Sequence, residues 1–235
     1  MMPRVTAILA ALNEAPNIGP VVRGCLAHAE EVLVIDDGSS DETAAVAAAA
    51  GARVVQLSKN RGKGVAVRRG AHEARGEVLV FLDADGQDDP SDIPALLTAL
   101  HDDVDMVVGS RFLGHFEQNA IEPLHAWGNR ALTGMVNGLF SAALTDTQAG
   151  FRALRRDRFL SCALDARGYD VEVDLVLELL GTGGRIVEVP VTRRARAHGH
   201  SHLRTFRDGT RIAIRIARQR LKRRRSGRGR SSPSR

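Results

Sequence analysis

Short apolar runs recur along the chain, and the segments between them place their apolar positions at helical spacing. The runs are "VTAILAAL", "EVLVID", "RVVQL", "EVLVFLD" and "DMVVGSRF". Residues 15–30 and 41–50 lie between such runs and are rich in alanine or helical in periodicity, and Pro16 stands where a first helical turn tolerates proline. Strands that alternate with helices predict a mostly parallel sheet covered on both faces. We therefore expect an α/β fold.

The end of each predicted strand is polar, charged or rich in glycine. These ends read "ALNEAPN", "DDGSSDET", "SKNRGKG", "DADGQDD" and "GSRF". In an open parallel sheet the carboxyl ends of the strands lie at one edge, and ligands bind there. The sequence thus predicts a site that combines an acidic pair, a basic glycine loop and a second acidic pair.

The pattern changes beyond Phe112. We expect a mobile loop at residues 112–122 and a helix at residues 123–140. "LTDTQAGFRALRRD" is typical of a loop, a short strand and a turn into a helix, residues 171–180 are helical, and "RIVEVPVTRR" indicates a late strand. The sequence contains no internal repeat and no second segment with its own core pattern.

Length and composition suit one large α/β domain, since the chain has 235 residues, of which 43% are hydrophobic. No apolar run reaches the roughly 18–20 residues that cross a bilayer. "RVTAILAAL" has the length of a signal-peptide core, but the regular strands that follow favour a first buried strand. Cys25 and Cys162 are the only cysteines, which indicates neither a disulfide framework nor a zinc site and agrees with a reducing cytosol.

The net charge of +5 belongs to the C-terminal end. Residues 220–235 hold eight Lys and Arg and no acid, and subtracting these from +5 leaves −3 for the rest. We expect a basic amphipathic helix at residues 206–222 and a disordered polybasic tail at residues 223–235. The cationic stripe of the helix comprises Arg204, Arg207, Arg211, Arg215, Arg218 and Lys222.

Two interpretations of this helix stay open. It is either a surface anchor for anionic lipid or a helix packed on the body with solvated arginines. Nucleic acid is a third partner class, but no aromatic residue interrupts the basic tail, which disfavours recognition by base stacking.

The stretch "FLDADGQDDP" carries four acidic residues in the seven that follow Leu82. Asp83, Asp85 and Gln87 offer the oxygen ligands that hard divalent cations prefer. Alternation along an extended chain would put all three side chains on the same side. The alternative is a plain acidic turn, because Asp and Gly are also turn residues.

Seven motifs in order carry a family resemblance: "ALNEAPNI", "VIDDGSSDET", "NRGKGVAVRRG", "FLDADGQDDP", "VVGSRF", "DTQAGFRALRRD" and "HGHSHL". From about residue 4 to residue 205 the chain resembles the family 2 inverting glycosyltransferases. Among these it is similar to the polyprenyl-phosphate sugar synthases, such as dolichol-phosphate mannose synthase. The resemblance implies a GT-A fold over residues 1–205, with a nucleotide-sugar half at about 1–111 and an acceptor half at about 112–205.

The resemblance also implies roles for individual residues. The set expected to bind the nucleotide-sugar is Ala10, Leu12, Glu14, Val34, Asp36, Asp37, Lys63, Asp83, Ala84 and Asp85. The set expected to bind Mg²⁺ or Mn²⁺ is Asp83, Asp85 and Gln87. The set expected at the acceptor phosphate is Arg111, Arg196, Ser201 and His202, and the catalytic set is Asp85, Arg111, Asp146 and Arg152. The chain departs from the family pattern at Ala10 and Leu12, where a proline and an aromatic residue are usual, and at His202, where a lysine is usual.

Several of these residues also have purely structural interpretations. Asp36 and Asp37 follow a buried strand, where acids often cap the next helix, and Asp146 and Arg152 could form a structural salt bridge. "NRGKG" lacks the spacing of a P-loop, although Lys63 at a helix start would still attract a diphosphate.

The roles of Glu172 and Asp174 stay open, and the histidine-rich stretch has a structural interpretation. Glu172 and Asp174 lie two apart in a predicted helix, so we expect at most one to point inward. "HGHSH" is a polar turn rather than a zinc site.

These residues favour metal-dependent hexosyl transfer from UDP- or GDP-hexose to a polyprenyl phosphate, with the enzyme peripheral at the cytoplasmic face of the membrane. A divalent cation would neutralise the charge of the departing diphosphate. A phosphate acceptor is already anionic and needs arginines rather than a base, whereas a hydroxyl acceptor would require a base, with Asp146 the leading candidate. The alternatives are a soluble family 2 transferase with a small phosphorylated or hydroxylic acceptor, and a non-catalytic nucleotide or nucleic-acid binding protein.

Overall fold

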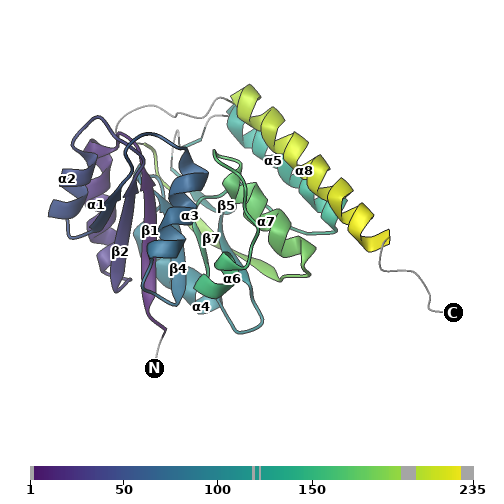
Figure 1. Ribbon diagram of the computed structural model, residues 1–235, viewed down its shortest axis with the longest axis horizontal. Helices are drawn as coiled ribbons and strands as arrows, with labels where there is room; N and C mark the ends of the chain where they lie inside the picture. Colours follow the sequence, from purple (N-terminus) through teal and green to yellow (C-terminus); the bar gives the residue numbers. More distant parts are fainter. Residues whose placement is uncertain (1–2, 118–119, 122, 197–204, 229–235) are drawn as a thin grey trace.

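One seven-stranded sheet organises the molecule, with strands in the order β3-β2-β1-β4-β6-β5-β7 (Figure 1). The computed structural model describes residues 3–117, 120–121, 123–196 and 205–228. The strands are β1 (Val5–Ala11), β2 (Glu31–Asp36), β3 (Arg53–Gln56), β4 (Val78–Asp83), β5 (Met106–Phe116), β6 (Arg152–Arg155) and β7 (Ile186–Arg193). All pairings are parallel except those of β6, which runs antiparallel to β4 and β5. The expected α/β fold with a mostly parallel sheet is confirmed.

Helices cover both faces of this sheet, as the alternation of strands and helices predicts. They are α1 (Ala15–Leu26), α2 (Thr43–Ala49), α3 (Lys63–Glu73), α4 (Ile93–Ala99), α5 (Pro123–Phe140), α6 (Arg156–Leu160), α7 (Val171–Gly181) and α8 (Thr205–Arg228), with a 3-10 turn η1 (Pro90–Asp92). Helices α1, α2 and α4 contribute to one hydrophobic cluster, and α3, α5, α6, α7 and α8 contribute to the other.

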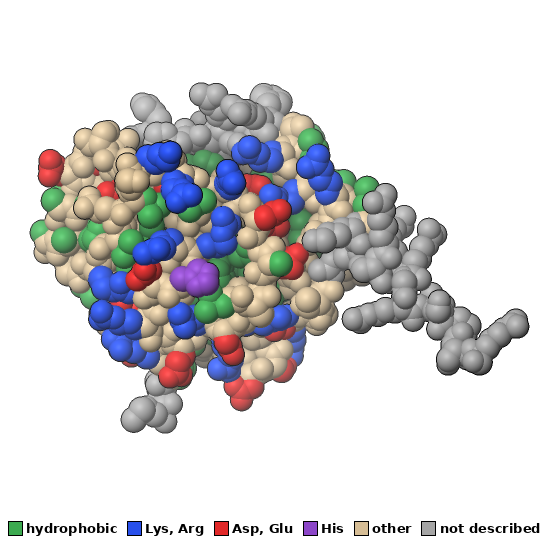
Figure 2. Space-filling model, viewed as in Figure 1, with side chains coloured by type: hydrophobic (Ala, Val, Ile, Leu, Met, Phe, Trp, Pro, Cys, Tyr) green, Lys and Arg blue, Asp and Glu red, His purple; other side chains and the backbone are tan. Residues whose placement is uncertain are grey.

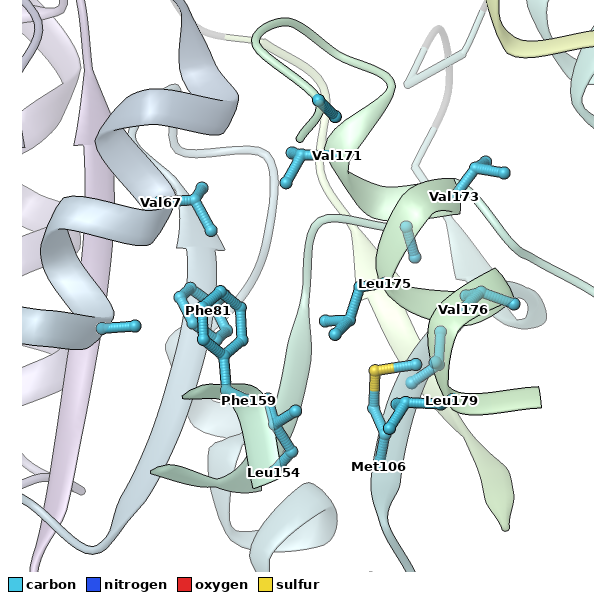
Figure 3. Packing of buried hydrophobic residues seen from close by; sticks show 14 of the residues in the cluster. Val67, Phe81, Met106, Leu154, Phe159, Val171, Val173, Leu175, Val176 and Leu179 are labelled. Atoms are coloured by element: carbon cyan, nitrogen blue, oxygen red, sulfur yellow. The ribbon is translucent and has the colours of Figure 1, made fainter. Parts of the chain in front are cut away.

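The period-two pattern of the strands divides the buried side chains between these two clusters. In β2, Leu33 and Ile35 join the α3 and α7 side, whereas Val32 and Val34 join the α1 side. Figure 3 shows the cluster on the α3 and α7 side, where Phe81 of β4 lies against Phe159 of α6 with ring centroids 5.2 Å apart. Burial on both faces explains why the central strands are almost continuously apolar.

The register aligns the carboxyl ends of the first four strands at one edge of the sheet. Ala11 pairs with Asp36, Asp36 with Gln56, and Ala10 with Asp83. After β3 the chain crosses back past β1 to form β4, so the strand order reverses between β1 and β4. This is the switch point at which open α/β sheets bind ligands.

The expected mobile loop at residues 112–122 is wrong over its first half. Strand β5 continues to Phe116, and its outer part pairs with β7 at His115–Thr192 and Phe116–Arg193, beyond an irregularity between Ser110 and His115. The expected boundary between the two halves at residue 111 therefore falls inside a strand. Gly114 and His115 interrupt the apolar pattern between Leu113 and Phe116, and this hid the extension of the strand.

The C-terminal helix packs on the body. Ile212 and Ile216 are buried in the α5 and α7 cluster, and Figure 1 shows α8 beside α5. Arg215 donates to Asp170 and Asp174 at 2.8 Å each and also pairs with Asp165, so this part of the cationic stripe faces inward.

The helix is also longer than expected. It extends to Arg228, past the end expected at residue 222, and the rest of the expected tail, 229–235, lies outside the described residues. Among the described residues, none of the helices combines the length and the apolar character that a bilayer crossing requires.

Candidate active site

A cleft of about 600 Å³ opens at the carboxyl edge of the sheet. Its walls come from the ends of β1, β4 and β7, from the middle of β5, and from α5 and the starts of α3 and α7. It gathers eleven of the residues expected from the sequence: Ala10, Leu12, Glu14, Asp37, Lys63, Asp83, Ala84, Asp85, Gln87, Arg111 and Arg196. Residues that belong to distant parts of the sequence thus share one cavity.

The acidic stretch reaches the cleft through a turn. Strand β4 ends at Asp83, and Gly86 has φ +76°, a conformation that glycine adopts without strain. The Gln87 amide donates to Asp85 Oδ1 at 3.0 Å, which closes the turn. The expectation that alternation along an extended chain aligns Asp83, Asp85 and Gln87 is therefore wrong, although all three line the cleft.

Lys63 lies between two carboxylates at the floor of the cleft. Its Nζ is 2.5 Å from Asp83 Oδ1 and 2.7 Å from Glu172 Oε1. Burial opposes ionisation of Asp83, but the charges of Lys63, Arg193 and Arg111 outweigh it and lower the pKa of Asp83 to about 2. Gly150 allows this arrangement, because a Cβ there would stand 3.0 Å from Asp83 Oδ1.

Two arginines bracket the other candidate ligands. Arg196 Nη2 is 2.6 Å from Asp85 Oδ2, and its Nη1 is 3.3 Å from Glu14 Oε1. Arg193 donates to Asp88 at 2.7 Å and to Gln87 Oε1 at 3.0 Å. The sequence analysis missed Arg193, although it is the last residue of β7 and the strand-end rule applied there would have marked it.

Burial also acts on the carboxylates beside these arginines. It raises the pKa of Glu14 above its ordinary value, against the hydrogen bond from Asn17 and the charge of Arg196. Burial likewise raises the pKa of Asp88 despite Arg193, with Asp83 and Asp85 adding to the rise. The cleft therefore holds carboxylates of unequal acidity, with Asp83 the more readily ionised.

The donor set fits a hard divalent cation. Two carboxylates and an amide oxygen at one wall of the cleft match the ligands that Mg²⁺ and Mn²⁺ accept. Within the described residues, no three His, Cys, Asp or Glu side chains form a preformed metal cage. The candidate set differs from such a cage because its third member is Gln87 and because a cationic side chain contacts each member.

Asp146 and Arg111 form a second buried group, beside β5. Asp146 is fully buried, and its carboxylate accepts from Arg111 Nε at 2.7 Å, from Arg111 Nη2 at 2.9 Å and from Asn129 Nδ2 at 2.9 Å. Burial opposes ionisation of Asp146, but Arg111 outweighs it and lowers the pKa. Arg111 itself lines the cleft, whereas Asp146 lies behind it.

The salt bridge between Asp146 and Arg152 that the sequence suggested is wrong, because Asp146 pairs with Arg111. Arg152 is 2% exposed and donates to backbone carbonyls, at 2.6 Å to Ala149 and at 2.9 Å to Thr147, with a third bond to Glu172 O. Burial lowers its pKa to about 10. Since Arg152 does not line the cleft, its position suits a residue that fixes the surrounding loop.

The other expected residues divide between the cleft and its surroundings. Asp36 is buried and accepts from the Ser39 amide at 2.9 Å, and neither Asp36 nor Val34 lines the cleft. Asp37 does line it and accepts from the amides of Arg61 and Gly62 at 2.8 Å each, which fixes the basic glycine loop. Ser201 and His202 lie outside the described residues.

The expectation for Glu172 and Asp174 is also corrected. Both are buried, at 7% and 3% exposure, so neither forms a solvated helix face. Glu172 pairs with Lys63, and Asp174 pairs with Arg215 of α8. The first turn of a helix presents residues two apart to different neighbours, and here both neighbours are cations.

Further polar residues line the cleft that the sequence analysis did not mark. They are Asn60, His125, Asn129, Gln148 and Tyr169. The Tyr169 ring lies 5.7 Å from Lys63 Nζ. Most of these residues stand in loops or on a helix face without a local signature, so only the fold brings them to the cleft.

Residues 6–160 match the family described as Glycosyl transferase family 2. Undecaprenyl-phosphate mannosyltransferase of Micrococcus luteus is 34% identical over 217 residues, which cover 85% of this chain and 87% of that protein. The low-salt glycan biosynthesis hexosyltransferase Agl6 of Haloferax volcanii is 29% identical over 216 residues, which cover 89% of this chain but 52% of that protein. The chain thus spans about half the length of Agl6.

A solved structure shares the fold. Glucosyl-3-phosphoglycerate synthase from Mycobacterium tuberculosis, in complex with Mn²⁺, UDP-glucose and phosphoglyceric acid, superposes with a TM-score of 0.74 at 24% identity, over 93% of this chain and 79% of that one. This likeness and the mixed seven-stranded sheet confirm the GT-A type of fold. With the family match over residues 6–160, they show that the chain is an enzyme that belongs to glycosyl transferase family 2.

Proposed function

We propose that the enzyme transfers a hexose, with inversion, from a nucleoside diphosphate sugar to a polyprenyl phosphate, and that it requires Mg²⁺ or Mn²⁺. Membership of a glycosyltransferase family removes the non-catalytic alternative. The name of the Micrococcus luteus relative supports the acceptor, and the complex of the structural neighbour supports a metal ion and a nucleotide-sugar.

The burial and the hydrogen bonds of Asp146 favour a phosphate over a hydroxyl group as the acceptor. A hydroxyl acceptor requires a base, and Asp146 was the leading candidate. Asp146 is fully buried, bonded to Arg111 and Asn129, and has a lowered pKa, so it is a poor proton acceptor. A phosphate acceptor needs no base, and Arg111 presents the cation that would hold it.

Asp83, Asp85 and Gln87 would hold the metal ion, which when bound neutralises the charge that grows on the departing diphosphate. Lys63 at the start of α3 and Arg196, which both line the cleft, would bind phosphate oxygens. Arg111, fixed by Asp146, would orient the acceptor. These roles place the donor diphosphate at the β4 end of the cleft and the acceptor phosphate at the β5 end.

A membrane surface is the proposed location, because a polyprenyl phosphate resides there. Helices α5 and α8 lie side by side and expose Leu124, Trp127, Ile214 and Leu221, with Trp127 70% exposed. Tryptophan and leucine beside cationic residues are typical of helices that lie in a membrane interface. Elsewhere, Figure 2 shows Lys and Arg side chains lying among acidic ones on the face in view.

The direct test is product formation. We expect a glycolipid when the protein is incubated with Mn²⁺, a panel of UDP- and GDP-hexoses and a polyprenyl phosphate, and no product when excess chelator is present. A parallel reaction should contain small phosphorylated acceptors such as phosphoglycerate. Transfer to these alone would replace the proposal with the small-acceptor alternative, which the same Arg111 site could serve.

A further inference from the structure

Three cations in the cleft share one arrangement. Lys63 joins Asp83 to Glu172, Arg196 joins Asp85 to Glu14, and Arg193 joins Gln87 to Asp88. In each case one partner is a candidate metal ligand and the other is a carboxylate outside that set. The three are largely buried, with side chains 17%, 19% and 11% exposed.

From this arrangement we propose that Lys63 and Arg196 act as exchangeable counter-ions that occupy the metal ligands until the nucleotide arrives. The inference rests on the proposed function, since it concerns the same metal and donor. Each cation can release the metal ligand and keep its second carboxylate, so release does not strand a buried charge. That matters because a buried charge without a partner is strongly destabilising.

The exchange has a thermodynamic consequence. A divalent ion that binds alone must take oxygens from Lys63 and Arg196 and then lie beside two cations, which weakens its binding. A nucleoside diphosphate brings anionic oxygens to which both side chains can donate charge-assisted bonds. Metal and nucleotide therefore strengthen each other's binding, and the coupling is reciprocal.

The proposal predicts opposite effects for two neighbouring variants. Lys63→Met removes the competing cation, so Mn²⁺ alone should bind about tenfold more tightly, equivalent to about 1.4 kcal/mol. Glu172→Gln removes the second partner of Lys63 and leaves the ammonium to Asp83, so Mn²⁺ alone should bind a few-fold more weakly. Lys59→Met is the matched control, because it removes one positive charge at an exposed position outside the cleft lining and should leave the affinity unchanged.

The measurement is calorimetric titration of Mn²⁺, or loss of the free Mn²⁺ paramagnetic resonance signal, without nucleotide and with saturating UDP or GDP. In the unmodified protein we expect the nucleotide to tighten Mn²⁺ binding by tenfold or more. In Lys63→Met this coupling factor should be smaller than in the unmodified protein and in the Lys59→Met control, leaving the direct attraction between Mn²⁺ and the diphosphate. Thermal melting should accompany each titration, and Arg196→Gln serves as a second variant with the same expected sign should Lys63→Met not fold.

The outcomes distinguish failure of the proposed function from failure of the counter-ion exchange alone. If the unmodified protein binds no Mn²⁺ even with UDP or GDP, the proposed function and the exchange both fail. If the unmodified protein binds Mn²⁺ equally well with and without nucleotide, the exchange alone fails. It also fails if the folded Lys63→Met or Arg196→Gln variant binds Mn²⁺ no more tightly than the Lys59→Met control.

Discussion

Two buried aspartates, each paired with an arginine, differ in how many hydrogen bonds hold them: Asp85 lines the cleft and Asp146 lies behind it. Asp146 receives two guanidinium bonds from Arg111 and further bonds from Asn129 Nδ2 and the Gln148 amide, and its own amide donates to Glu188. Asp85 receives the Gln87 amide and one bond from Arg196, whose other nitrogen contacts Glu14.

The difference shows that burial of an ion pair does not by itself distinguish a structural role from a role in ligand binding. The Asp146–Arg111 pair has side chains 0% and 14% exposed and is tied into the loop and the sheet, so it presents one fixed cation. The Asp85–Arg196 pair lies in the cleft lining, and its arginine has a second partner. We infer that the first pair is a scaffold and the second is an exchangeable contact for ligands.

The largest expected effect comes from breaking the exchangeable pair at its acid. Asp85→Asn should reduce kcat/KM for transfer by about 1,000-fold, because the loss of about 4 kcal/mol of charge stabilisation corresponds to about three decades in rate. The melting temperature should change little, since Arg196 keeps Glu14 as a partner when Asp85 loses its charge. Activity with Mn²⁺ and the proposed substrates is the measurement. Full activity in this variant, or in excess chelator, would contradict the metal site.

The scaffold pair should respond in the opposite way. Asp146→Asn leaves Arg111 without its counter-charge in a buried place and should lower the free energy of unfolding by about 3–5 kcal/mol. Asp102→Asn is the control, since Asp102 is a fully exposed aspartate paired with Arg155 and its loss should change stability little. Denaturant unfolding measures both. An Asp146→Asn variant as stable as the control would remove the distinction between scaffold and exchangeable contact.

The pH dependence of unfolding gives a second measurement of the same pair. Arg111 lowers the pKa of Asp146 below its ordinary value of 3.8, despite burial. A lowered folded-state pKa contributes stability that is complete above the ordinary value and is lost as the pH falls through the lower, folded-state value. The stability difference between the unmodified protein and Asp146→Asn should therefore shrink below pH 3.8. A constant difference down to pH 2 would contradict the origin of this stability in the ionised carboxylate.

The two pairs also show how far the sequence could predict the site. The strand pattern correctly predicted that β1, β3 and β4 end at one edge, because parallel strands have their carboxyl ends on the same side of the sheet. The motifs that carry the family resemblance marked Asp85 and Asp146 as candidates. The sequence suggested Arg152, six positions away, as the partner of Asp146, whereas only the folded chain brings Arg111 of β5 to it.

The cleft residues from α5 and from the loop before α7 were the hardest to predict. His125 and Asn129 lie on α5, and Tyr169 lies in the loop before α7, where the spacing of residues carries no signal for a cavity. The sequence did not decide whether Glu172 points inward, because a helical position alone does not specify the neighbouring residue. Its partner is Lys63, which lies more than a hundred positions away in the sequence.

Arg196→Ala tests the role of the exchangeable arginine with a smaller effect. We expect kcat/KM for the polyprenyl phosphate to fall about tenfold to a hundredfold, because charge-assisted hydrogen bonds contribute about 1.5–3 kcal/mol. The affinity for UDP or GDP measured with Mn²⁺ should fall by a comparable factor, because the diphosphate loses the guanidinium that the proposed exchange delivers to it. Arg194→Ala is the matched control, since Arg194 is nearby, 48% exposed and paired with Asp89 outside the cleft. A nucleotide affinity equal to that of the control would contradict the transfer of Arg196 to the diphosphate and would assign Arg196 to the acceptor phosphate alone.

The smallest expected effects concern the surface formed by α5 and α8, which should leave both aspartate pairs undisturbed. Deleting residues 220–235 removes eight basic residues, while Ile212, Ile216 and Arg215 still hold the helix on the body. Binding to vesicles with anionic lipid should weaken at low salt, and the difference should vanish at high salt, because each basic residue contributes about 1 kcal/mol of screened attraction.

Trp127→Ser should weaken vesicle binding by about tenfold at every salt concentration, because burial of an apolar side chain contributes about 1.5–3 kcal/mol and is not screened. Ser161→Ala is the control, because it is a single substitution away from this surface and should leave vesicle binding unchanged. Transfer to a short, water-soluble polyprenyl phosphate should stay nearly unchanged in both the deletion and Trp127→Ser, because Asp85, Arg196, Arg111 and Asp146 are intact. If the unmodified protein ignores anionic vesicles at low salt, the membrane location fails. If the loss from Trp127→Ser disappears at high salt, the contact is electrostatic and the apolar face of α5 does not enter the lipid.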